Sequence, residues 1–182
     1  MFIQQLRETY LNPYGDEKKY GITTHKWLEK VIRKNFPVTE MEKKILDLDI
    51  MSAITTLAEE IHTKFPVRKD VKMALPDLLS QLQQTQKQES NCRVSAAILG
   101  SLLQHLAITD RVGVVNLPEY KDQHAACVVE KDGLLYLIRF GYIGRGFAVN
   151  TLGSSSERDV NFFPITPDGL VNFEKQAGNM RY

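Results

Sequence analysis

Two residues of the sequence, Cys92 and His124, are of the types that together perform acyl transfer. A thiolate attacks a carbonyl carbon, while an imidazole first removes the thiol proton and then protonates the leaving group. Cys92 opens a run of small and apolar residues, 92–106, which predicts a buried helix with Ser90 or Asn91 as its N-cap. A cysteine in a first helical turn lies near unpaired backbone N–H groups and the positive end of the helix dipole, which favour the thiolate and can stabilise an oxyanion.

His124 begins a predicted strand whose next residues are small and apolar, where an imidazole needs a hydrogen-bonding partner. Side chains of a strand alternate between its two faces, so His124 and Cys127 lie on opposite faces. If His124 faces the helix, Cys127 does not. We therefore expect no disulfide between Cys92 and Cys127, and we expect Cys127 to fill space in the core. For Cys92, as for Cys127, the simpler interpretation is a buried cysteine that only fills space.

The surrounding elements predict an α+β fold, with a helical N-terminal region over residues 1–89 and an α+β core over 90–182, together one compact domain. An amphipathic helix is expected over Thr24–Phe36. A long helix is expected from a capping box at Thr39 and Glu42 to Phe65, and another from Leu75. Residues on the buried stripe of the long helix are Met41, Ile45, Leu48, Ile54, Leu57, Ile61 and Phe65. The predicted strands, 111–117, 124–130, 134–140, 147–152 and 160–165, form an antiparallel meander with the Cys92 helix across one face.

The stretch from Asn91 to about Leu152 resembles the transglutaminase-like cysteine hydrolases of the papain-like superfamily. That superfamily includes transglutaminases, arylamine N-acetyltransferases, transglutaminase-like peptidases and several toxin deamidases. The resemblance rests on Asn91-Cys92-Arg93-Val94-Ser95-Ala96 and on His124-Ala125-Ala126-Cys127-Val128-Val129-Glu130, followed by a turn and Leu134-Leu135-Tyr136-Leu137-Ile138. It implies a papain-like core in which Cys92 is the nucleophile and His124 its base, with no cofactor.

The sequence departs from this family at the residue that orients the histidine. The family has an acidic or amide residue about fifteen positions after the histidine, where this chain has Arg139, a side chain that accepts no hydrogen bond. A tight turn near residues 144–145 would pair Asn150 with Arg139 on the His124 face. Asn150 is therefore the candidate orienting residue, with Asp159 as the alternative.

Two tight turns determine that assignment. Asp132-Gly133 is typical of a two-residue hairpin, and it would place His124 opposite Gly141.

Gln86 or Gln88, which precede Cys92 within a glutamine-rich run, could donate to an oxyanion as a glutamine does in papain-like enzymes. His25, His62 and His105 have no second ligand one helical turn away, so we expect no metal site.

Net charge and cysteine content indicate which classes of partner and of fold the chain does not favour. The 182 residues carry 23 Lys and Arg against 22 Asp and Glu, a formal net charge of +1, so no overall field favours nucleic acid or an anionic membrane. Two cysteines are too few for a disulfide scaffold. The apolar stretches are short and interrupted, and the first residues show no cationic region followed by a long apolar one, so we expect neither a membrane span nor a signal peptide. We therefore expect a cytoplasmic protein, or an effector delivered by a specialised secretion system as toxin relatives are.

Three functional hypotheses follow. The first is a hydrolase or acyltransferase that acts on amides of a protein or peptide through a Cys92 thioester, with His124 and Asn150 as the other catalytic residues. It would be a deamidase, a transglutaminase or a peptidase. The second is an inactive papain-like protein that binds a protein partner, with Arg139 marking the loss of the triad. The third is an unrelated structural protein with a buried thiol.

Overall fold

The computed structural model describes residues 24–67, 90–117, 124–141, 146–154, 163–166 and 169–170. The helices are α3 (Thr24–Asn35), α4 (Val38–Ile45), α5 (Ile50–Lys64) and α7 (Cys92–Leu106). The strands are β1 (Arg111–Leu117), β2 (His124–Lys131), β3 (Leu134–Phe140), β4 (Phe147–Ser154), β5 (Phe163–Thr166) and β6 (Gly169–Leu170). The predicted α+β class is confirmed, and the bounds of α7 are those predicted for the Cys92 helix.

All strand pairs of the sheet are antiparallel, in the order β4-β3-β2-β1-β5-β6. The predicted meander is correct for β1 to β4. The fifth strand does not extend the meander beyond β4. Instead β5 pairs with β1, through Gly113 and Val114, and so lies at the opposite edge of the sheet from β4. A sequence pattern identifies a strand but not its non-local partner.

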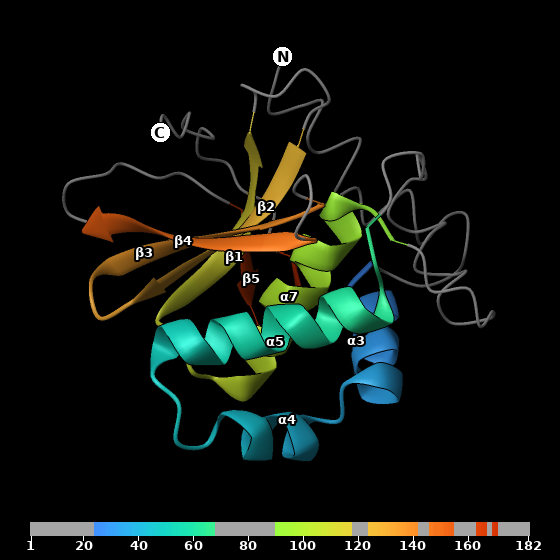
Figure 1. Cartoon of the computed structure of the whole chain (residues 1–182). Coiled ribbons are helices and arrows are strands. Elements are labelled where there is room, and N and C mark those ends of the chain that lie inside the picture. Colours follow the sequence, from blue (N-terminus) through green and yellow to red (C-terminus); the bar gives the residue numbers. More distant parts are fainter. Residues whose placement is uncertain are drawn as a thin grey trace.

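The two faces of the sheet bury two different sets of apolar side chains. The main cluster joins residues of α3, α4, α5 and α7 to one face of the sheet, where Cys127 and Val129 of β2 contribute. In Figure 1 α3, α4 and α5 lie below the sheet. The second cluster, on the opposite face, consists of Ala126, Val128, Leu135, Leu137 and Leu152. Both faces of the central strands are therefore buried.

The prediction of a single long helix over residues 39–65 is wrong. The chain forms α4 and α5, separated by Leu46–Asp49, and Leu48, expected in the buried stripe, is 43% exposed. Asp49 begins α5 as its N-cap, since its side chain accepts a hydrogen bond from the Ser52 N–H at 2.9 Å. The capping box at Thr39 does not form either: Pro37 is the N-cap of α4 and makes no side-chain cap.

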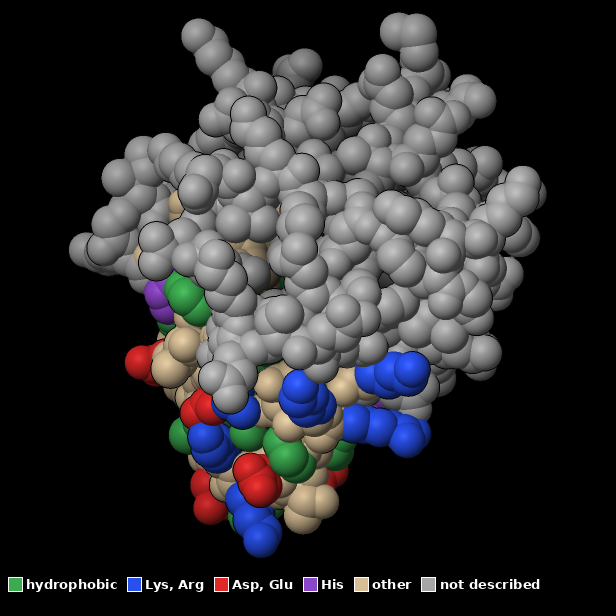
Figure 2. All heavy atoms as spheres, turned by 90° about the vertical axis from the view of Figure 1, so that its right-hand side faces the viewer, with side chains coloured by type: hydrophobic (Ala, Val, Ile, Leu, Met, Phe, Trp, Pro, Cys, Tyr) green, Lys and Arg blue, Asp and Glu red, His purple; other side chains and the backbone are tan. Residues whose placement is uncertain are grey.

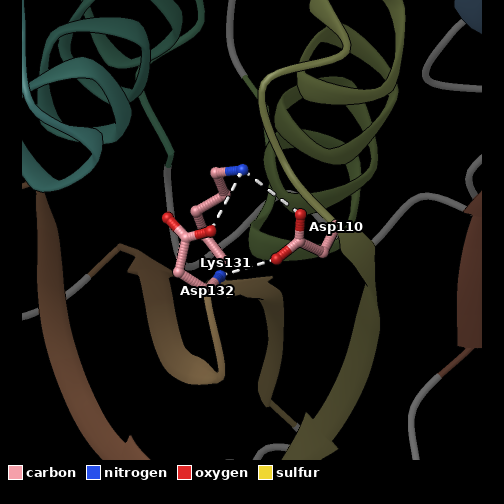
Figure 3. Close-up of polar contacts among 3 residues, drawn as sticks. All are labelled: Asp110, Lys131 and Asp132. Carbon is pink, nitrogen blue, oxygen red and sulfur yellow. Dashed lines mark hydrogen bonds and ion pairs between the residues drawn. The ribbon is translucent and has the colours of Figure 1, made fainter.

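The hairpin between β2 and β3 has the predicted two-residue turn, because Lys131 pairs with Leu134 and both Asp132 and Gly133 have positive φ. Asp110, just before β1, accepts from the Asp132 N–H at 2.6 Å and from Lys131 Nζ at 3.2 Å (Figure 3). These two contacts hold the pKa of Asp110 below its ordinary value. The connection from α7 to β1 is thus tied to the hairpin.

The surface in Figure 2 carries Lys and Arg side chains as well as Asp and Glu side chains on the part of the molecule that is described. The described part of this face therefore carries charges of both signs. Within the described ranges, no helix combines the length and apolar character that crossing a bilayer requires.

Candidate functional site

Cys92 is the first residue of α7 and is half-buried at the border of the main cluster. Asn91, in extended conformation, is the N-cap: its Oδ1 accepts a hydrogen bond from the Val94 N–H at 3.1 Å. Ala96 and Leu99, on the same helical face as Cys92, are buried. The sequence thus predicted the position of Cys92 correctly, and Asn91 rather than Ser90 caps the helix.

Ser90 instead fixes the start of α7 to Pro66 and Val67, which follow α5. Its N–H donates to the Pro66 carbonyl at 3.0 Å, and it forms a parallel bridge with Val67. Its hydroxyl lies 3.1 Å from that of Ser95, and both serines are fully buried. A buried hydroxyl without a partner is costly, so this pair favours one position of the first turn of α7. The sequence indicated Ser90 only as a possible N-cap and gave no role to Ser95, although two serines flanking a cysteine at a helix start are a visible signal.

The end of α5 also contacts the turn between β3 and β4. A Cβ on Gly141 would lie 2.7 Å from Val67 Cγ1, and a Cβ on Gly146 would lie 2.1 Å from His62 Nε2. The His62 ring also packs against Phe147, with 6.0 Å between ring centroids, and its Nδ1 is buried without a hydrogen-bond partner. Residues from His62 to Val67 therefore contact both the start of α7 and the β3–β4 turn.

His124 begins β2, where its backbone pairs with Leu117, the last residue of β1. The 15 residues of α7 and the 7 of β1 each span about 23 Å and are joined by a short connection, so α7 and β1 run in opposite directions over similar lengths. The starts of α7 and β2 consequently lie at the same end of the sheet (Figure 1). The side chain of His124 is outside the described part of the structure.

The alternation of side chains along β2 bears most on whether Cys92 and His124 can meet as predicted. Cys127 and Val129 belong to the cluster with α7, and Ala126 and Val128 to the opposite one. The prediction that Cys127 fills space is confirmed: it is fully buried, both cysteines are free, and burial raises the pKa of the Cys127 thiol. Regular alternation, continued to position 124, assigns that position to the face away from α7. A Cys92–His124 contact would therefore need a departure from alternation at the first residues of β2.

Asn150 lies near Arg139, but not in the predicted register. Arg139 pairs with Ala148, and Asn150 pairs with Leu137, because the strands pair from Phe140 and Phe147 outward rather than from a turn at 144–145. A shift of two residues keeps the Asn150 side chain on the same face of the sheet as Arg139. Arg139 Nη2 donates to Asn150 Oδ1 at 3.0 Å. The amide oxygen that would accept from an imidazole N–H thus accepts from Arg139.

The other candidate site residues, Asp159, Gln86 and Gln88, lie outside the described residues, as does the helix expected from Leu75. In the ranges that are described, no three His, Cys, Asp or Glu side chains gather as a metal ion requires.

Comparison with protein-family models, with curated proteins and with solved structures finds no match to this chain.

Proposed function

We propose that the chain is a cysteine-dependent hydrolase or acyltransferase that acts on amides of a protein or peptide, of deamidase, transglutaminase or peptidase type. Cys92 at the first position of α7 carries this proposal. Its side chain is half-buried rather than enclosed, unlike that of Cys127, and the buried Ser90–Ser95 pair holds the helix start that bears it. A thiol fixed there is close to the backbone N–H groups of the first turn and to the positive end of the helix dipole.

The proposed reaction requires that the first residues of β2 depart from regular alternation, so that the His124 imidazole reaches Cys92. The imidazole takes the Cys92 proton, and the thiolate sulfur attacks the amide carbon. The carbonyl oxygen becomes an oxyanion near the N–H groups of the first turn of α7. The C–N bond then breaks, and the amine or ammonia leaves with the proton from the imidazole. Water or a second amine attacks the thioester, which regenerates the thiol. No metal or organic cofactor enters these steps.

Trapping the thioester tests this chemistry without knowledge of the natural substrate. p-Nitrophenyl acetate should release a burst of nitrophenolate and leave an acetyl group on Cys92, located by peptide mass spectrometry. Cys127→Ala serves as the matched control and should retain the burst, whereas Cys92→Ala and His124→Ala should lose it. Equal slow acylation in wild type and His124→Ala would contradict the proposal.

A second candidate, an inactive papain-like protein that binds a protein partner, is favoured by two observations. Arg139, which stands where the resemblance leads us to expect the residue that orients the histidine, donates to Asn150, and Ala126 and Val128 of β2 lie on the face away from α7. On this account the fold persists while the thiol is inert. Absence of the burst in a folded wild-type protein would support this candidate over the first.

A further inference from the structure

Residues 62–67, at the end of α5 and just after it, lie against the base of the turn that joins β3 to β4. A Cβ on Gly141 would lie 2.7 Å from Val67 Cγ1, and a Cβ on Gly146 would lie 2.1 Å from the His62 ring. The Gly141 N–H donates to the Gly146 carbonyl at 2.7 Å, so the two glycines close the turn together. Both ends of the segment 62–67 are therefore in close contact with this turn.

The same segment is joined through its backbone to the start of α7. The Ser90 N–H donates to the Pro66 carbonyl at 3.0 Å, and Ser90 forms a parallel bridge with Val67. The Ser90 hydroxyl lies 3.1 Å from that of Ser95 in the first turn of α7, and Cys92 stands between the two serines in the sequence. Val67 thus contacts the β3–β4 turn with its side chain and Ser90 with its backbone.

The packing along this path leaves no room for independent movement. Protein interiors are close-packed and have low compressibility, so they transmit a displacement to neighbouring groups. The contact of Val67 with Gly141 does not admit even one further methyl group. At the other end, the hydroxyls of Ser90 and Ser95 are fully buried, and separating them would leave buried polar groups without partners. A displacement of the turn therefore has to move Val67 and disturb the start of α7.

We propose that the β3–β4 turn is coupled to the first turn of α7 through Val67, so that a change in the β3–β4 turn alters the reactivity of the Cys92 thiol. Displacement of Val67 moves Ser90 and loosens the helix start that bears Cys92. The coupling itself is a matter of packing and does not depend on catalysis by Cys92. That it regulates an enzyme rests on the proposed function.

Gly141→Ala in the full chain tests the coupling, because the new methyl group displaces Val67. The Ser90 N–H should exchange with solvent at least about tenfold faster than in wild type, measured by NMR, since its hydrogen bond to Pro66 is disturbed. Cys92, which is half-buried, should be alkylated by iodoacetamide at least about threefold faster at about pH 9, where a free thiol is largely ionised and the rate reports access. Fully buried Cys127 should stay unlabelled while the variant is folded.

Gly133→Ala is the matched control, since its φ of +75° is close to the +76° of Gly141 and nothing lies within 4 Å of a Cβ there. It should leave both rates as they are in wild type. In a Val67→Ala chain, which lacks the Cγ1 atom that the new methyl group meets, Gly141→Ala should change neither rate.

Val67→Ala alone keeps the proposal testable if Gly141→Ala does not fold. It should speed exchange of the Ser90 N–H more than Val38→Ala does, the same substitution at a half-buried valine of α4. Equal exchange in these two variants would overturn the coupling. So would a folded Gly141→Ala chain in which either rate is unchanged, an equal effect of Gly133→Ala, or an effect of Gly141→Ala that persists without Val67.

The coupling and the proposed function fail in different experiments. A chain that shows the coupling but no burst with p-nitrophenyl acetate would overturn the proposed function alone. A chain with the burst, in which Gly141→Ala leaves Cys92 and the Ser90 N–H unchanged, would overturn the coupling alone.

Discussion

Replacement of Gly146 by alanine tests how the end of α5 fits against the β3–β4 turn. Gly146 has φ of +74°, and alanine in that region costs about 1–2 kcal/mol. The new Cβ would also lie 2.1 Å from His62 Nε2 and 2.3 Å from Cε1, so the ring, which packs against Phe147, must shift. Forced repacking of this kind costs about 1–3 kcal/mol. We expect Gly146→Ala to lower the free energy of unfolding by about 2–5 kcal/mol, measured by urea titration.

Gly133 provides the control, because its φ of +75° is nearly the same and nothing lies within 4 Å of a Cβ there. Gly133→Ala should therefore show the conformational cost alone, about 1–2 kcal/mol. In a His62→Ala background, Gly146→Ala should cost no more than Gly133→Ala does, because the ring is gone. Equal losses for the two single glycine variants would refute the claim that His62 packs against this turn.

Three further predictions concern the cap, the ion pair and the buried thiol. Asn91→Ala removes the acceptor of the Val94 N–H and should lower the free energy of unfolding by about 1 kcal/mol; no change would exclude the cap. The lowered pKa of Asp110 contributes stability above the pKa of the unfolded carboxyl, and this stability is lost as pH falls through the folded pKa. Wild type should accordingly lose more stability than Asp110→Asn between neutral pH and about pH 3, followed by urea midpoints. Cys127→Ser buries a hydroxyl in an apolar cluster and should cost about 1–3 kcal/mol by the same titration, and a neutral effect would contradict full burial.

The sequence predicted local structure well where one residue decides it. Asn91 caps α7 because its side chain reaches the N–H three residues on, and Asp132-Gly133 turns the chain because both residues tolerate positive φ. The break between α4 and α5 was missed for a physical reason. Leu46–Asp49 is about one helical turn long, so the apolar stripe stays in phase across it and periodicity cannot reveal it.

The site was predictable only in part, because its geometry depends on pairing between distant segments. That Asn150 and Arg139 share a face was predicted although the register was wrong, since a shift of two residues keeps side chains on the same face, but their hydrogen bond was not predicted. The attachment of Ser90 to Pro66 and Val67, and the contact of His62 with Gly146, involve separate segments of the chain. No local pattern in the sequence indicates them.

The central claim is that Cys92 and His124 act as a thiolate–imidazole pair. The most direct measurement is the pH dependence of iodoacetamide alkylation at Cys92, by peptide mass spectrometry, in wild type and His124→Ala. Buried Cys127 serves as an internal reference that should stay unlabelled while the protein is folded. The proposal predicts that Cys92 reacts well below the free-thiol pKa of about 8.5 and loses this reactivity when His124 is replaced. A Cys92 that reacts only near that pKa, or equally in both proteins, would contradict it.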